Sequence, residues 1–161
     1  MKAIVFSVLV IGMAVQTAAD TGWRGVHVMA WGPAGGNEGL PLLKRAIEEV
    51  LRPQGVNALV YEVGYNFAFD SHPDMRFDKT ISKEEARDLA RFCKERGIRL
   101  IPQFNCLGHQ SWAKRNMIFP LVAVHPEFEE VPDVPEAKRK ELLKNWCPLH
   151  PDVYPLVFDL I

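Results

Sequence analysis

The sequence lacks any excess of charge of one sign. Its 161 residues carry 19 lysines and arginines against 20 aspartates and glutamates, a formal net charge of −1. Because no block of basic residues is present, the composition indicates neither nucleic acid nor an anionic membrane surface as a partner. Hydrophobic residues make up 48% of the chain, which is ordinary for a packed globular protein. The length predicts about one domain.

Long hydrophobic runs are scarce, and the longest lies at the start of the chain. Lys2 precedes an apolar run over residues 3–15, and small residues at 17–19 offer a cleavage site. The run is too short to span a bilayer core of ~30 Å. We interpret residues 1–19 as a signal peptide, which predicts a secreted or periplasmic protein without a membrane anchor. A buried first helix is the alternative.

Cysteine is sparse, and its odd number of three excludes a fully paired disulfide framework. Cys93 lies on a helical pattern and is predicted to be buried. Cys106 and Cys147 lie in loops beside aromatic residues, and a disulfide between them is a hypothesis that export would permit. The histidines show no H-x-x-x-H spacing and no grouping with cysteine, so we expect neither a metal nor a cofactor.

Segments typical of strands and helices alternate after residue 22. Strand patterns occupy residues 25–31, 57–63 and 99–104, and helical patterns occupy residues 40–51 and 82–96. Such alternation predicts parallel strands with helical crossovers, hence an α/β fold. Both an open doubly wound sheet and a (β/α)₈ TIM barrel fit. The sequence has no G-x-G-x-x-G leading into a helix, which favours the barrel.

The last third of the chain is less regular. Proline interrupts residues 120–134, which we predict to be a loop, whereas residues 135–145 have a short helical pattern. Residues 151–161 resemble the first turns of another helix, because a proline and an aspartate suit a helix N-terminus. We therefore expect residues 20–161 to form about the first three βα units of a truncated barrel domain.

Polar residues stand where the predicted strands end. Trp31 closes the first strand, Glu62 the second, and Gln103 and Asn105 the third, with His109 in the loop beyond. In a βα barrel the carboxyl ends of the strands surround the active site, so these residues are candidates for a polar cavity. Each also has a structural alternative. Glu62 could form a salt bridge, the two amides could satisfy loop backbone groups, and His109 could lie on the surface.

One segment resembles a known enzyme family. Residues 97–112, GIRLIPQFNCLGHQSW, are similar to the third barrel strand of glycoside hydrolase family 20, the β-N-acetylhexosaminidases, with its Gly-His step at 108–109. Arg24-Gly25 and Asn57-Ala58-Leu59 resemble the starts of the first two strands of that family. The resemblance implies a TIM barrel that hydrolyses O-glycosidic bonds in an oligosaccharide or glycoconjugate.

The resemblance also implies roles for particular residues. His109 would support the catalytic pair, and the sugar pocket would be lined by Glu62, Gln103, Asn105, Trp112 and Trp31. In the family an Asp-Glu pair at the fourth strand orients the acetamido nucleophile of the substrate and protonates the glycosidic oxygen. No Asp-Glu dipeptide occurs in these 161 residues. The general acid is therefore expected beyond residue 161, and the fragment alone is expected to be inactive.

The sequence departs from the family at five positions. Gln103 and Asn105 stand where the family has Glu and Asp, Met29 where it has Asp, Gly32 where it has Arg, and Glu62 where it has His. These changes leave two alternatives open. One is another secreted barrel glycosidase of the β-galactosidase type, and the other is a non-catalytic carbohydrate-binding barrel protein.

Overall fold

The structure is a computed structural model. It describes residues 22–29, 36–106, 108–112, 117–130, 134–135, 138 and 144–161. The predicted signal peptide and Trp31 lie outside the described residues. Within the described part of the chain, no helix combines the length and the apolar character needed to cross a bilayer.

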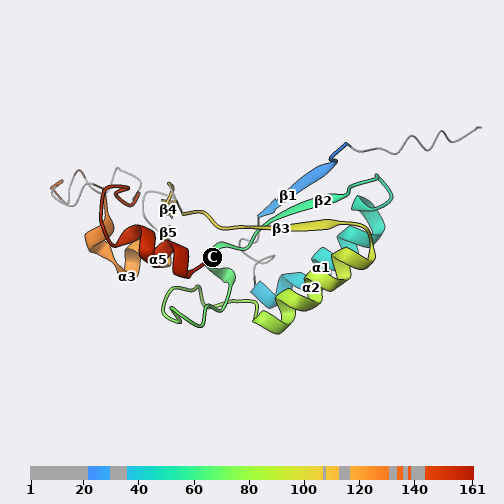
Figure 1. The fold of residues 1–161 in the computed structure, drawn as a ribbon, viewed down its shortest axis with the longest axis horizontal. Helices are drawn as coiled ribbons and strands as arrows, with labels where there is room; N and C mark the ends of the chain where they lie inside the picture. Colours follow the sequence, from blue (N-terminus) through green and yellow to red (C-terminus); the bar gives the residue numbers. More distant parts are fainter. Residues whose placement is uncertain are drawn as a thin grey trace, which may run out of the picture.

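Three parallel strands form the central sheet (Figure 1). The strands β1 (Gly25–Met29), β2 (Ala58–Glu62) and β3 (Arg99–Gln103) pair in the order β1-β2-β3. Apolar and β-branched residues dominate the first two, as expected for strands with helical crossovers. The prediction of a mixed α/β fold with parallel strands is confirmed. β2 is two residues shorter and β3 one residue shorter than predicted.

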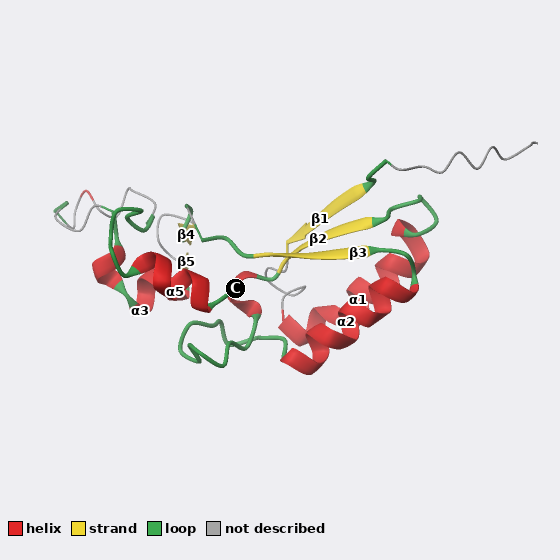
Figure 2. Cartoon of the chain, viewed as in Figure 1, coloured by secondary structure: helices red, strands yellow, loops and turns green. Residues whose placement is uncertain are grey.

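Two helices cover one face of this sheet (Figure 2). Helix α1 (Gly36–Ala46) continues as one π-helical turn, Ile47–Leu51, and helix α2 (Lys83–Glu95) connects β2 to β3. Helix α1 begins four residues before the predicted helix. At its start Gly36 has φ +63°, and a Cβ there would lie 2.8 Å from the backbone of Lys79. Close approach of the chain therefore requires glycine at this position.

The predicted ends of α2 are both confirmed. The Ser82 hydroxyl accepts from the Glu85 backbone N–H at 3.2 Å, and the Glu85 carboxylate accepts from the Ser82 N–H at 2.8 Å. This capping box satisfies two amides that the first turn leaves unpaired. Gly97 follows the last turn with φ +70°, the left-handed conformation typical of a residue that ends a helix.

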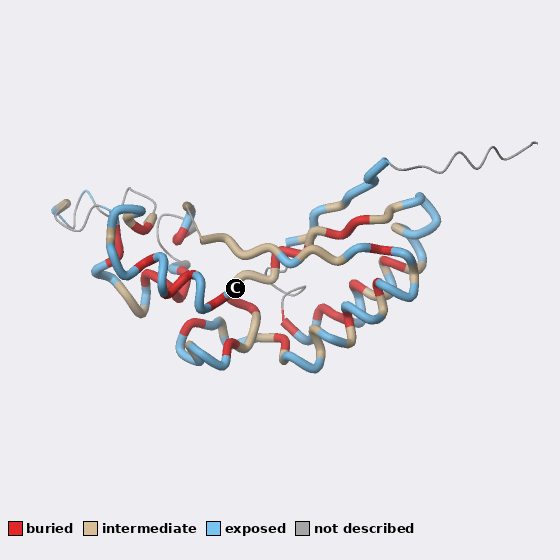
Figure 3. Tube along the Cα trace, viewed as in Figure 1, coloured by how far each residue is buried: buried red, intermediate tan, exposed pale blue. Residues whose placement is uncertain are grey.

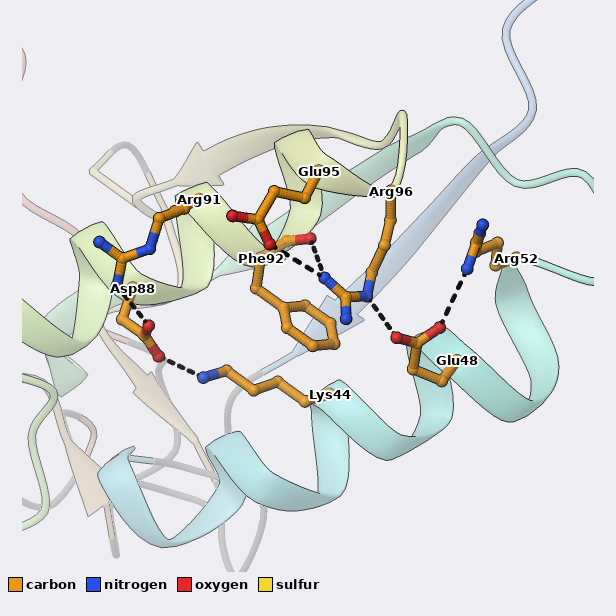
Figure 4. A network of polar contacts seen from close by, with 8 residues as sticks. All are labelled: Lys44, Glu48, Arg52, Asp88, Arg91, Phe92, Glu95 and Arg96. Atoms are coloured by element: carbon orange, nitrogen blue, oxygen red, sulfur yellow. Dashed lines mark hydrogen bonds and ion pairs between the residues drawn. The ribbon is translucent and has the colours of Figure 1, made fainter.

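Charged side chains join the outer surfaces of the two helices (Figure 4). Lys44 pairs with Asp88, and Glu48 pairs with Arg96, whose guanidinium also lies 3.5 Å from the centre of the Phe92 ring. The hydrogen bond from Arg96 lowers the pKa of Glu48, and that from Lys44 lowers the pKa of Asp88. These pairs lie at the solvent-facing side of the helices, where the carboxylates are exposed, so each contributes little to stability.

The core beneath the sheet comes from alternate strand residues. Leu59 and Tyr61 of β2 belong to one buried cluster with Ile47, Leu89 and Cys93 of the helical layer. Figure 3 shows buried positions along both the central sheet and the helices that cover it. Because side chains alternate along a strand, Val60 and Glu62 point to the opposite sheet face. Burial of Cys93 confirms its predicted structural role.

The residues after β3, together with the segment after β2, build a second packed region beyond the carboxyl ends of the strands (Figure 1). It contains a short hairpin of β4 (Ser111–Trp112) and β5 (Met117–Ile118), and helices α3 (Pro120–Val124) and α5 (Val153–Asp159). Its buried core includes Tyr65, Phe119, Leu121, Trp146 and Val153.

Two predictions for this region need correction. Residues 120–128 are not a loop throughout, because Pro120 begins α3 and Pro126 begins a 3-10 turn, Pro126–Phe128. Proline is tolerated there because the first helical residue needs no N–H. Cys106 and Cys147 are both free thiols, so the hypothesised disulfide is not formed. By contrast, α5 confirms the helix predicted near residues 151–161.

Candidate functional site

Strand register brings candidate residues together at one edge of the sheet. Glu62 is the partner of Met29 on β1 and of Gln103 on β3. Since neighbouring strands lie about 4.8 Å apart, the Glu62 and Gln103 side chains leave adjacent backbone positions on the same face. This face is opposite α1 and α2, and we call it the opposite face. It carries alternate residues of all three strands: His27, Met29, Val60, Glu62, Ile101 and Gln103.

Glu62 is buried and paired. It is 6% exposed, and its Oε2 lies 3.1 Å from Nε2 of His27 on the neighbouring strand. The two side chains therefore face each other across the pair of strands. A buried carboxylate is costly without such a partner. The sequence analysis predicted Glu62 but not His27, whose place opposite Val60 depends on strand register.

The loop after β3 carries the other two polar candidates. Asn105 is half-buried, and its carbonyl accepts a hydrogen bond from the side chain of Gln110 at 3.2 Å. His109 is exposed and has φ +55°, a left-handed conformation that is uncommon for residues other than glycine. Its backbone N–H donates to Oδ1 of Asn145 at 2.9 Å. Asn145 therefore helps to hold the unusual backbone of His109 in place.

Gln110 links this loop to the segment after β2. It is fully buried, accepts from the Tyr65 hydroxyl at 3.0 Å, and donates to the carbonyls of Asn105 and Gly108 at 3.2 and 3.3 Å. Burial raises the pKa of the Tyr65 phenol, so the hydroxyl remains the donor. The sequence analysis missed both residues in this role. Their only sequence signal was polarity inside an aromatic stretch.

A buried ion pair lies in the same region. Nζ of Lys144 is 2.5 Å from Oε2 of Glu129, and their side chains are 11% and 3% exposed. Ser111 is also buried, and its hydroxyl accepts from the backbone N–H of Lys144 at 2.7 Å. Removing either Lys144 or Glu129 would leave a buried charge without a partner, which is strongly destabilising. The pair therefore anchors this part of the chain. Sequence spacing offered no signal for a pair 15 residues apart in a proline-rich stretch.

Two cavities in the described structure lie away from Glu62. One, of about 510 Å³, lies at the amino ends of the strands and includes Trp23, Asn57 and Arg99. The other, of about 290 Å³, is mostly apolar and lies between the sheet, α2 and the end of α5, with Tyr61 and Phe104 among its lining residues. Gln103 contributes to this second cavity, but Glu62 lines neither.

Two further candidates are tryptophans. Trp112 belongs to β4, next to the buried Ser111, and Trp31 lies outside the described residues. Among the described residues, no group of three or more histidine, cysteine, aspartate or glutamate side chains could hold a metal ion. The structure thus places Glu62 beside Gln103, and carries Asn105 and His109 on a loop fastened by Gln110 and Asn145.

Comparison with known proteins yields a similarity of fold. No protein-family model matches the chain, and no curated protein matches it. The chain resembles the X-ray structure of a chitobiase from Flavobacterium johnsoniae, FjGH20, with a TM-score of 0.63 and 19% sequence identity. The similarity covers 86% of this chain and 21% of that chain, so the sequence spans about a fifth of the length of the chitobiase. The described α/β arrangement is therefore similar in fold to part of a family 20 glycoside hydrolase.

Proposed function

We propose that the chain supplies the first three βα units of a (β/α)₈ glycoside hydrolase domain of the β-N-acetylhexosaminidase type. The observation that carries the proposal is the register of Glu62 and Gln103 at the carboxyl ends of adjacent parallel strands. In barrel enzymes this end holds the active site. The fold similarity to a chitobiase and the Gly108-His109 step after β3 support the same assignment.

The proposed chemistry assigns one role to each type of side chain. The Glu62 carboxylate accepts hydrogen bonds from sugar hydroxyls, and the amides of Gln103 and Asn105 can both donate and accept. The proposal assigns the aromatic rings of Trp112 and Trp31 to stacking on a sugar ring. His109 supports the acid and its aspartate partner, which this proposal places in residues that follow position 161. The proposal needs no metal or cofactor.

Direct sugar binding tests this function without requiring turnover. We expect saturation-transfer NMR to detect chitobiose binding to residues 20–161, with a dissociation constant on the order of 1 mM, or about 4 kcal/mol. Hydrolysis of an aryl N-acetylglucosaminide is not expected. Glu62→Gln should weaken binding roughly 10–150-fold, because a hydrogen bond to a charged group is worth ~1.5–3 kcal/mol. Glu49→Gln, an exposed glutamate on the π-helical turn, is the matched control.

Absence of chitobiose binding in folded wild-type protein would overturn the proposal. Equal binding by the Glu62→Gln and wild-type proteins would show that the sugar lies elsewhere. Galactose in a parallel titration tests the β-galactosidase-type alternative, which predicts preference for that sugar.

A non-catalytic carbohydrate-binding protein is the second candidate. The observation that favours it is the presence of the uncharged amides Gln103 and Asn105 on the third strand, where the similar family has Glu and Asp. Sequencing the coding DNA downstream of codon 161 distinguishes the two. An open frame that continues through a strand into Asp-Glu supports the hydrolase, and a frame without such a pair supports the binding protein.

A further inference from the structure

The pair formed by His27 and Glu62 is asymmetric in its exposure. The glutamate side chain is 8% exposed, whereas the histidine side chain is 45% exposed. The ion pair joins Nε2 of His27 to Oε2 of the carboxylate, and Oε1 is not among the buried side-chain atoms of the described residues that lack a hydrogen-bond partner. A carboxylate oxygen has two lone-pair sites, so Oε1 can accept a hydrogen bond from a ligand while Oε2 is held by the imidazole.

Among the described residues of this sheet face, His27 is the side chain that pairs with Glu62. Among the alternate residues of β1, β2 and β3 on the opposite face, the other charged side chain is Arg99. Arg99 lies at the amino end of its strand, in register with Ala58, and its guanidinium is 4.8 Å from the centre of the Trp23 ring. The residues in register with Glu62 on the two neighbouring strands are Met29 and Gln103, and neither carries a charge.

We infer that His27 is a positioning residue for sugar recognition: it holds Oε2 of Glu62 so that Oε1 accepts a hydroxyl of the bound sugar. The inference rests on the proposed function and extends it to a residue on β1. Its physical basis is preorganisation, since a carboxylate already held in one rotamer loses less freedom when the ligand binds. His27 itself acts through Glu62 and need not contact the sugar.

Two substitutions of similar polarity separate positioning from general stability. In His27→Gln the longer amide places an N–H near the position of Nε2, whereas in His27→Asn the shorter side chain does not reach Oε2. We expect His27→Asn to weaken chitobiose binding by roughly tenfold, or ~1.4 kcal/mol. His27→Gln should restore affinity to within about threefold of wild type. A role in folding alone predicts that the two variants bind alike when compared per folded molecule.

A second His-Glu pair in the chain provides the matched control. Nδ1 of His125 hydrogen-bonds Oε1 of Glu127 at 2.9 Å, in the region built by the residues after β3. His125→Asn should leave chitobiose affinity unchanged. In the double variant His27→Asn/Glu62→Gln, the loss should equal that of Glu62→Gln alone, because the histidine acts only through that carboxylate.

The readouts are chitobiose titration by NMR, the melting temperature, and the imidazole ¹⁵N signals of His27. Glu62→Gln should shift those signals in the absence of sugar, which reports the pair independently of binding. Unchanged imidazole signals, or equal affinity of the His27→Asn and wild-type proteins, would overturn the positioning role alone. If folded wild-type protein bound no chitobiose, the proposed function would fail together with this inference. Melting curves confirm that each variant tested is folded.

Discussion

The hydroxyl of Tyr65 donates a hydrogen bond to Oε1 of Gln110 at 3.0 Å, and both side chains are almost completely buried. Tyr65 follows β2 and Gln110 lies in the loop after β3. The same glutamine donates to the carbonyls of Asn105 and Gly108. The segments that follow two neighbouring strands are therefore joined through one amide, which places the loop carrying Asn105 and His109.

Removing the Tyr65 hydroxyl should lower stability. Tyr65→Phe keeps the ring contacts, including Phe104 at a centroid distance of 4.9 Å, but leaves Oε1 of Gln110 without its donor. An unsatisfied buried acceptor costs about 1–3 kcal/mol, which corresponds to a fall of roughly 2–12 °C in Tm. Thermal denaturation followed by circular dichroism measures it. Tyr154→Phe, at an exposed tyrosine, is the control, and equal Tm values for the two variants would contradict the prediction.

The backbone of His109 should favour glycine over alanine. At φ +55° an L-residue pays a conformational penalty that glycine avoids. We expect His109→Gly to unfold with a free energy about 0.5–1 kcal/mol higher than His109→Ala. Urea denaturation of both variants measures the difference. An alanine variant at least as stable as the glycine variant would show that the loop does not require the left-handed conformation.

The contacts between α1, its π-helical extension and α2 should weaken in acid. Hydrogen bonds from Arg96 and Lys44 lower the pKa of Glu48 and Asp88, respectively, in the folded protein. Carboxyls whose pKa is lowered by folding stabilise the protein above their unfolded pKa, near pH 4. This contribution is lost as the pH falls through their folded values.

Tm measured from pH 7 to pH 2 should therefore fall below about pH 4, and the fall should be smaller in Asp88→Asn. Added salt at neutral pH should reduce the same contribution, since these groups are exposed. An acid response in Asp88→Asn identical to that of the wild type would show that this carboxyl contributes nothing.

The isolated chain should self-associate. Large apolar side chains are exposed, including Trp23 at 63%, Phe158 at 68% and Ile161 at 83%. In the described sheet, β1 and β3 are the outer strands and each has one edge without a strand partner. Edges and apolar patches of this kind promote association. Light scattering coupled to size-exclusion chromatography of residues 20–161 should show oligomers, and a monodisperse monomer with a cooperative melt would contradict the expectation.

Export should remove the first residues of the chain. Lys2, the apolar run over residues 3–15 and the small residues at 17–19 motivate cleavage near Ala19. N-terminal sequencing of secreted protein should begin close to Asp20. Exported material that still begins at Met1 would show that this segment is not a cleaved signal.

Local patterns in the sequence were enough to predict the elements that depend on neighbouring residues. Helix α2 was recognised from Ser82, Glu85 and Gly97, because a capping box and a left-handed helix end involve residues only a few positions apart. The parallel strands followed from the alternation of apolar segments with helices. The polar strand ends, Glu62 and Gln103, were likewise visible as departures from apolar strands.

Short elements were harder to predict. Helix α3 has five residues, begins with Pro120 and is soon followed by Pro126, so its periodicity is too brief to distinguish from a loop. Its apolar residues Leu121 and Val122 are buried against residues more than 30 positions away, in α5. Tertiary burial, more than local preference, stabilises so short a helix.

Only tertiary structure decided which polar residues meet. His27 and Glu62 are 35 positions apart and contact each other because β1 and β2 pair in one register; a shift by one residue would turn His27 to the helical layer. Gln110 and Tyr65 are 45 positions apart, and Lys144 and Glu129 are 15 positions apart. Each pair forms only when the intervening chain folds back on itself. Sequence periodicity determined which faces are apolar, whereas strand register and loop closure determined the partners of each buried polar group.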